Sequence, residues 1–196
     1  SEFVAGSDRV LRTKVVPQLR TYPTIRAWQV GGSLGNLYLL SILLREAGLM
    51  NRSTIYFTDP CEEALGQARG GRLSPSALKK FKQSYRDGGG RKDPEIYLVR
   101  QGKATYFAPE LKNHLTFFQH NPTTDSSFIE FNLISCCCCL ENLAPEAQEH
   151  VHQLFFGSLC PLGYLRLDAR DALSHASYRH KYKPVGRTGA VFQRIR

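Results

Sequence analysis

The chain has 196 residues, 42% of them apolar, so it can bury a full hydrophobic core, and we expect one domain with at most a small excursion. No apolar run approaches membrane-spanning length and no signal peptide is visible, which predicts a cytoplasmic protein. The formal charge of +9 predicts an acidic partner: a glutamate-rich protein surface, an anionic nucleotide or nucleic acid. No nucleic-acid motif accompanies the basic clusters, and solubility alone would also explain them; they lie at 79–82, 86–92 and 179–187.

The first 24 residues are expected to form a helical lead-in, the remnant of an amino-terminal domain or a linker. Apolar residues recur near helical spacing over 7–22, and Pro17 should kink or split this helix. A short apolar run predicts the first strand at 25–30. A glycine-rich turn then leads into a second predicted helix, 37–48, which Gly48 should end.

The turn at 31–36 is the stretch around which the rest of the chain is organised; its glycines are Gly31, Gly32 and Gly35. Glycines let the backbone turn sharply and approach a ligand, and the helix start offers unpaired N–H groups to polar or anionic groups. The next predicted strand, 54–58, ends in Asp59, whose carboxylate could hold both hydroxyls of a ribose. Alternatively, Asp59 begins the following helix and accepts hydrogen bonds from backbone N–H groups.

Two further helices are predicted in the middle of the chain. The first covers 60–69 and begins with proline and two acids. The second is a basic helix over 74–85, with Ser74 as its amino-terminal cap. Three successive glycines at 88–90 predict a flexible link.

A small β-hairpin insert is predicted at about 93–109, because two β-prone runs, 95–99 and 103–107, flank Arg100-Gln-Gly102. The remaining apolar runs predict strands at 115–118, 131–137 and 162–167, another within 182–196, and a helix at 145–156. Strands that alternate with helices predict an α/β doubly wound sheet. Ligands of such sheets lie beyond the carboxyl ends of the strands, where the glycine turn, Asp59, His120, Asn121 and the cysteine run should meet.

Four of the six cysteines are contiguous, from Cys136 to Cys139. Neighbouring residues on a strand point to opposite faces, so these four thiols cannot close on one zinc ion. No CxxC pair is present outside this run, and we expect buried or half-buried thiols rather than a metal or redox centre. His120 is expected to be a packed or capping histidine, and Asn121 could simply be a turn residue before Pro122.

The order of these pieces resembles the methyltransferase domain of the chemotaxis-receptor methyltransferase (CheR) family over roughly residues 10–196. Four motifs carry the resemblance: IRAWQVGGSLGN, IYFTDPCEEALGQAR, LTFFQHNPTTD, and FNLISCCCCLENL followed by VHQLFFGSLCPLGYLRL. The resemblance implies a Rossmann-like methyltransferase fold at 25–196, with S-adenosylmethionine as cofactor. It also implies that the hairpin corresponds to a small antiparallel subdomain that helps to dock the receptor.

Carried over residue by residue, the resemblance implies that Gly31 and Gly35 form the methionine-side turn of the cofactor site. It implies a ribose contact for Asp59 and an adenine-side contact for Asn121. Asn36, Cys137 and Cys138 occupy further cofactor-lining positions; no catalytic side chain and no metal ligand is implied.

The chain departs from the family pattern at several of these positions. Two acids after the last glycine are replaced by Asn36 and Leu37, and an Arg-Asn pair is replaced by Cys137 and Cys138. Loss of the carboxylate that faces the cofactor's amino group forfeits roughly 1.5–3 kcal/mol, tenfold or more in affinity. Leu34 replaces a small hydroxyl residue, and 141–143 lacks the family's Ile-Tyr-Phe.

These departures favour a domain that has lost methyl transfer and acts as a regulatory or binding module in bacterial signalling. The alternative is an active S-adenosylmethionine-dependent protein-glutamate O-methyltransferase acting on chemoreceptor-like proteins, because methyl transfer needs alignment more than acid–base groups. A further alternative is a sensor that holds a nucleotide or another small ligand in the old cofactor pocket. A protein partner with an acidic surface suits the first two hypotheses, and an anionic nucleotide suits the third.

Overall fold

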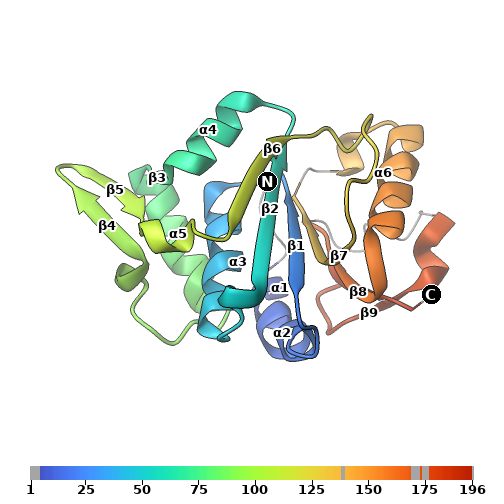
Figure 1. The fold of residues 1–196 in the computed structure, drawn as a ribbon, viewed down its shortest axis with the longest axis horizontal. Helices are drawn as coiled ribbons and strands as arrows, with labels where there is room; N and C mark the ends of the chain where they lie inside the picture. Colours follow the sequence, from blue (N-terminus) through green and yellow to red (C-terminus); the bar gives the residue numbers. More distant parts are fainter. Residues whose placement is uncertain (1–4, 138–139, 169–172, 174–176, 196) are drawn as a thin grey trace.

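A seven-stranded sheet forms the centre of the molecule in the computed structural model, which describes residues 5–137, 140–168, 173 and 177–195 (Figure 1). Its strands are β1 Ile25–Val30, β2 Ser53–Asp59, β6 Leu115–Gln119, β7 Phe131–Cys136, β8 Leu159–Arg166, β9 Tyr182–Pro184 and β10 Val191–Arg194. Their spatial order is β6-β2-β1-β7-β8-β10-β9. The first five strands of that order pair in parallel, and β10 runs antiparallel to both of its neighbours. The predicted doubly wound α/β sheet is confirmed.

The direction in which the chain adds strands reverses at β1. The chain passes from β1 to β2 and β6 on one side, and then returns to β7 and β8 on the other side. Such a reversal separates the loops that leave the two neighbouring strands and forms a crevice at their carboxyl ends, where doubly wound proteins bind ligands. The loops after β1 and β7 therefore define the candidate site.

Helices cover both faces of the sheet (Figure 1). They are α1 Ser7–Val10, α2 Val16–Leu19, α3 Leu34–Glu46, α4 Glu62–Gly70, α5 Pro75–Asp87 and α6 Pro145–Ser158. Side chains of β1 alternate between two hydrophobic clusters: Ala27 packs with α3, α4, α5 and the amino-terminal helix, and Trp28 packs with α6. Short 3-10 turns lie at Met50–Arg52, Pro94–Tyr97, Pro109–Leu111, Leu140–Asn142 and Ser177–Lys181. Within the described residues, no helix combines the length and apolar character that a membrane crossing requires.

The predicted first helix is interrupted near the proline, as expected, but by a change of helix type. A π-helical turn, Leu11–Val15, lies between α1 and α2, and Pro17 stands in the first turn of α2. Proline lacks an N–H and its ring displaces the preceding turn, which the wider π-turn accommodates. The buried side chains of this segment pack into the cluster around α3; they are Leu11, Val15, Val16 and Leu19.

A second, three-stranded antiparallel sheet of order β3-β5-β4 lies beside the main one. Its strands are β3 Arg72–Leu73, β4 Leu98–Gln101 and β5 Ala104–Phe107. The predicted hairpin is present, but its first strand begins later than expected. Residues 94–97 form a 3-10 turn, because Asp93 accepts a hydrogen bond from the Glu95 N–H and Pro94 fixes the turn's start. The β3 strand was not predicted, since two residues are too few to show the alternation of apolar and polar side chains that marks a strand.

Two other expectations are corrected by the backbone. The glycines at 88–90 are not an unattached link: their N–H groups donate to the carbonyls of Ser84, Arg86 and Tyr85. The single last strand expected within 182–196 is two strands, β9 and β10, because glycines with positive φ at 186 and 189 reverse the chain between them.

Candidate functional site

The glycine turn joins β1 to α3 in the conformation that its sequence predicts. Gly31 and Gly32 have φ of 58° and 90°, a region that favours glycine. The Gly31 N–H donates to the Thr58 carbonyl at 2.8 Å, which fixes the turn to the end of β2. Ser33 caps α3 by accepting a hydrogen bond from the Asn36 N–H at 3.3 Å.

The turn lies against the residue that follows β7. A Cβ built on Gly32 would come within 2.8 Å of the Cys137 Cβ, so only a residue without a side chain fits there. The Asn36 side-chain amide donates to the Cys137 Sγ at 3.3 Å. The Cys137 N–H also donates to the Val30 carbonyl at 3.0 Å, so the two loops are joined at the strand reversal. Gly35 lies in the first turn of α3, beside these contacts.

Leu37 is not a lining residue, contrary to the expectation that it replaces an acid facing the cofactor. Its side chain is completely buried in the hydrophobic cluster beneath α3. Asn36 is the half-buried residue at the edge of the turn, and its amide oxygen remains a hydrogen-bond acceptor. Relative to the family pattern, the residues at 36 and 37 therefore take one negative charge away from the site. The oxygen that can accept a hydrogen bond there is kept, on Asn36.

Asp59 stands at the carboxyl end of β2 and is half-exposed. Its Oδ1 accepts a hydrogen bond from the Cys61 N–H at 2.8 Å, just before α4 begins at Glu62. This is the helix-starting role that was one of the two alternatives for Asp59. A carboxylate has two oxygens, so that bond leaves Oδ2 to serve as an acceptor at the same edge.

Asn121 lies at the start of the loop after β6, and its side chain organises a turn. Its Oδ1 accepts from the N–H and hydroxyl of Thr123 at 3.1 and 2.8 Å. Its own N–H donates to Asp125 Oδ2 at 2.8 Å, and this hydrogen bond is the main reason why the pKa of Asp125 is lowered. The turn role of Asn121 is thus present in the structure, and its amide nitrogen faces no acceptor among the described residues.

His120 is a packed histidine, as expected. It is buried, with its ring 5.2 Å from Trp28 and 5.4 Å from Phe128 between ring centroids. Its Nε2 lies 3.1 Å from the Ser126 carbonyl oxygen. Trp28 is core, as expected, and its Nε1 donates to the Thr58 hydroxyl at 2.8 Å.

The cysteine run begins inside the sheet. Cys136 ends β7 and Cys137 follows it, both buried. Cys138, the other candidate site residue of the run, lies outside the described residues, as does Cys139. Among the residues that the structure describes, no group of three histidine, cysteine or acidic side chains could hold a metal ion.

Arg166, at the end of β8, was missed by the sequence analysis. Its side chain is fully buried and its Nη2 lies 2.8 Å from Asp8 Oδ1. It also donates to the Ser7 hydroxyl from Nε at 3.1 Å and from Nη2 at 2.8 Å. Burial lowers its pKa, and the Asp8 carboxylate opposes that shift. The available sequence signal was a charged residue inside the apolar run 162–167. Arg166 ties the amino-terminal helix to the carboxyl edge of the sheet.

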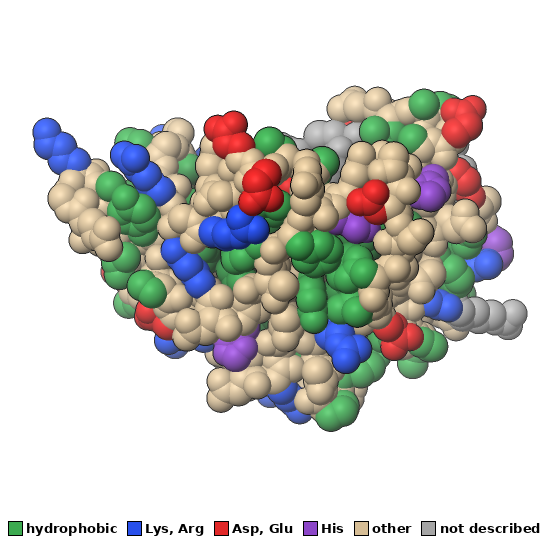
Figure 2. Space-filling model, turned by 45° about the horizontal axis from the view of Figure 1, so that its top comes forward, with side chains coloured by type: hydrophobic (Ala, Val, Ile, Leu, Met, Phe, Trp, Pro, Cys, Tyr) green, Lys and Arg blue, Asp and Glu red, His purple; other side chains and the backbone are tan. Residues whose placement is uncertain are grey.

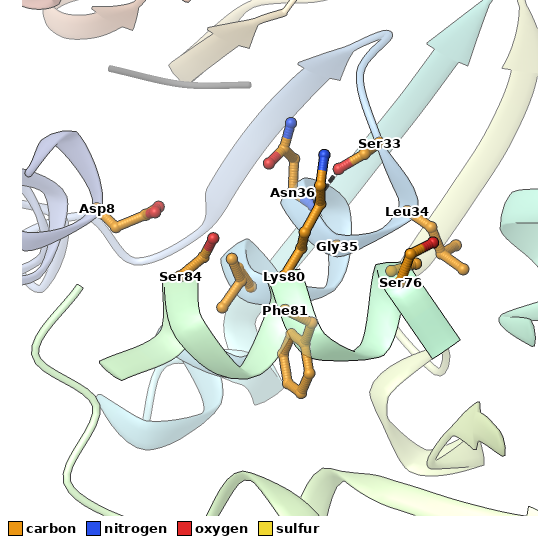
Figure 3. Close-up of a pocket in the computed structure, with 11 residues that line it drawn as sticks. Asp8, Ser33, Leu34, Gly35, Asn36, Ser76, Lys80, Phe81 and Ser84 are labelled. Atoms are coloured by element: carbon orange, nitrogen blue, oxygen red, sulfur yellow. Dashed lines mark hydrogen bonds between the residues drawn. The ribbon is translucent and has the colours of Figure 1, made fainter. Parts of the chain in front are cut away.

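A cavity of about 330 Å³ opens beside the glycine turn, between α3 and α5. Figure 3 shows Lys80 of α5 pointing toward Ser33 and Asn36, with Ser84 and Asp8 farther along the same cavity. Basic and acidic side chains are interspersed on the face drawn in Figure 2, where no continuous basic stripe of the kind that tracks nucleic acid is seen.

The site fits S-adenosylmethionine in its backbone. A cofactor with a sulfonium, an amino group and a ribose requires open space beside the backbone and hydrogen-bond acceptors. The structure provides the space that a Cβ at Gly32 would fill, the capped start of α3, and acceptors at Asn36 and Asp59. The difference from the expected set is electrostatic, because Asn36 is neutral and Cys137 stands where a guanidinium was expected.

Comparison with known proteins matches this arrangement. Residues 5–188 match the family model described as CheR methyltransferase, SAM binding domain. A Pseudomonas putida protein named "Putative methyltransferase Cher3" is 35% identical over 198 residues, which cover 99% of this chain and 72% of that protein. A Rhodobacter capsulatus protein, "Uncharacterized 104.1 kDa protein in hypE 3'region", is 26% identical over 96% of this chain, and the match spans 20% of its own length.

Two solved structures share the fold at low identity. The N-methyltransferase NodS from Bradyrhizobium japonicum, in complex with S-adenosylhomocysteine, aligns with a TM-score of 0.52 and 13% identity, covering 97% of this chain and 86% of NodS. The O-methyltransferase NovP aligns with a TM-score of 0.52 and 15% identity, covering 97% and 78%. These likenesses concern the fold. The family match over nearly the whole chain decides the identity: this chain belongs to the CheR methyltransferase family, as its S-adenosylmethionine-binding domain.

Proposed function

We propose that this domain is an S-adenosylmethionine-dependent methyltransferase that acts on carboxylates of a signalling protein. The observation that carries the proposal is the preserved cradle at the strand reversal, where Gly31 and Gly32 have positive φ and the turn contacts Cys137. Leu37 belongs to the core, so the loss of charged groups near the cofactor's amino end is smaller than the sequence indicated. The net charge of +9 favours a glutamate-rich protein substrate.

The site residues divide by the part of the cofactor that each would hold. The glycine turn and Asn36 would take the methionine half, with the Asn36 oxygen accepting from the amino group. Asp59 would accept from a ribose hydroxyl through Oδ2, and Asn121 would contact the adenine side through its amide nitrogen. Cys137 would border the reacting end. Cys138 is proposed for the same end on the resemblance alone.

The bound cofactor supplies an electrophilic methyl group. A substrate carboxylate is already deprotonated near neutral pH, so one of its oxygens could accept that methyl group without first losing a proton. No side chain is required as a general base. This chain's residues therefore act by holding the two reactants in line and by excluding water.

The second candidate is a domain that binds the cofactor or a related nucleotide without transferring the methyl group, and serves as a regulatory or binding module. Cys137 favours it, since a buried thiol there cannot orient a substrate carboxylate as a guanidinium would. Glu141 and Asn142 are exposed polar residues at the end of the same loop, where the family has Ile-Tyr-Phe.

Two measurements distinguish the candidates. Calorimetric titration with S-adenosylmethionine and S-adenosylhomocysteine should give micromolar binding, and Asp59→Ala should weaken it while Asp87→Ala on α5 should not. Incubation with isotopically labelled cofactor and a bacterial receptor fragment should then transfer label to the fragment. Treatment with base should release that label, as expected of a methyl ester. Binding without labelled product would favour the second candidate. No binding of either compound would contradict the proposal.

A further inference from the structure

A second cavity, of about 440 Å³, lies at the opposite end of α3 from the glycine turn. Its lining comes from the amino-terminal helix, the end of α3 and the loop after α5: Arg9, Arg12, Thr13, Glu46, Gly89, Arg91 and Lys92. Helix α3 runs from Leu34 to Glu46, which places this cavity roughly 18 Å along the helix from the cofactor turn. The proposed methyl transfer leaves this basic cluster without a role.

The floor of the cavity is a carboxylate whose charge is compensated inside the protein. Glu46 accepts hydrogen bonds from the hydroxyls of Tyr85 and Tyr97 at 2.6 and 2.7 Å. Arg12 pairs with it at 2.5 Å and also donates to the Gly88 carbonyl at 3.1 Å. Glu46 and Arg12 are therefore satisfied by each other and by their neighbours.

The rim is basic and is held in place by the same cluster. A Cβ on Gly90 would lie 2.3 Å from the Tyr85 ring, so the backbone lies directly on that ring. The Lys92 N–H donates to the Tyr85 hydroxyl at 3.1 Å. These contacts bring Arg91 and Lys92 beside Arg9 of α1.

The cations of the rim form no ion pair within the described residues. Arg9, Arg91 and Lys92 are exposed, and in the described part of the chain no carboxylate lies within ion-pair distance of them. The cavity lining therefore contains four cations and one carboxylate, which Arg12 compensates, so the lining carries a net positive charge. Such a surface attracts an anionic partner and accelerates its association.

We propose that this basic cavity is a docking site for an acidic segment of a protein partner, separate from the site at the glycine turn. Single-stranded nucleic acid is disfavoured, because its binding sites combine cations with exposed aromatic rings. Here Tyr85 and Tyr97 are 1% and 5% exposed and engaged with Glu46. Exposed cations on a concave rim match the carboxylates of a glutamate-rich peptide.

The test measures binding without S-adenosylmethionine, so failure of the methyl-transfer proposal does not affect it. A fluorescent glutamate-rich peptide and its glutamine counterpart are titrated by anisotropy at low salt. The variants are Arg9→Glu, Arg91→Glu and Lys92→Gln. Lys14→Glu is the matched control, because Lys14 is also exposed on the amino-terminal helical segment but lies outside the cavity lining.

The expected result is that the glutamate peptide binds, the glutamine peptide does not, and Arg9→Glu and Arg91→Glu each weaken binding about tenfold. Lys92→Gln should weaken it less, Lys14→Glu should change it less than about twofold, and added salt should weaken it. Equal affinity in Arg9→Glu and Lys14→Glu would overturn the proposal. So would tighter binding of a single-stranded oligonucleotide that is lost in the same variants. Thermal melting of each variant verifies that it is folded. If a charge-reversal variant unfolds, Arg91→Gln is measured in its place.

Discussion

The side-chain amide of Asn36 donates a hydrogen bond to the thiol of Cys137 at 3.3 Å. This contact joins the first turn of α3 to the end of β7 at the place where the sheet reverses its order. Both residues stand where the resemblance places charged residues, so the pair that closes the cradle carries no charge of its own. Changes at this pair should therefore alter cofactor affinity more than they alter the fold.

Asn36→Asp should strengthen binding of S-adenosylmethionine about tenfold, because a carboxylate forms a charge-assisted hydrogen bond with the cofactor's amino group. Calorimetry would measure the dissociation constant. Leu37→Glu is the matched contrast: that side chain is completely buried, so an ionised carboxylate there costs several kcal/mol and should lower the melting temperature sharply. A folded Leu37→Glu protein that binds more tightly would show that the assignment of position 37 to the core is wrong.

Gly32→Ala should weaken cofactor binding about tenfold or more and lower the unfolding free energy by about 1–3 kcal/mol. The new Cβ would lie 2.8 Å from the Cys137 Cβ, at a φ of 90° that residues with side chains rarely adopt. The control is Gly66→Ala in α4, where no atom lies within 4 Å of the added Cβ. That change should stabilise the helix by about 0.5–1 kcal/mol. Similar effects from both substitutions would contradict the assigned role of Gly32.

Asp8→Ala should lower the unfolding free energy by about 3 kcal/mol, because it removes the carboxylate partner of a fully buried guanidinium. Urea denaturation would measure the loss, and Asp87→Ala, an exposed acid on α5, is the control, expected within about 0.5 kcal/mol of the parent. A loss no larger than that of the control would mean that Arg166 is satisfied without Asp8.

Glu46→Gln should destabilise the protein by about 2 kcal/mol at neutral pH, since it weakens three hydrogen bonds to a charged acceptor. Burial disfavours the ionised carboxylate, but hydrogen bonds from Tyr85, Tyr97 and Arg12 outweigh it and lower the pKa of Glu46.

A lowered folded-state pKa gives stability that is present above the ordinary value of 4.5 and is lost as the pH falls through the folded value. The difference between Glu46→Gln and the parent should therefore shrink on acidification, as urea unfolding at successive pH values would show. Glu110→Gln, at an exposed position, is the control and should change the unfolding free energy by less than about 0.5 kcal/mol. A difference that is constant with pH would contradict the role of the Glu46 charge.

Local patterns predicted most of the fold. The first strand, 25–30, was predicted at its observed bounds, because its apolar run is closed on one side by Pro23 and on the other by the glycines. The cap at Ser74 was confirmed by its hydrogen bond from the Ala77 N–H at 3.2 Å. The short strand β3 and the start of β4 were not predicted correctly, since pairing with β5 rather than sequence period decides them.

The sequence by itself determined the order of strands and helices, the glycine turn and the family, because these depend on side-chain period and on residues with special backbone freedom. Only the tertiary structure decided which side chains face the site. Helix α3 rotates by about 100° per residue, so Asn36 reaches Cys137 while its neighbour Leu37 points into the core. The Arg166–Asp8 pair and the basic cavity around Glu46 join residues distant in sequence, and no local pattern specifies such contacts.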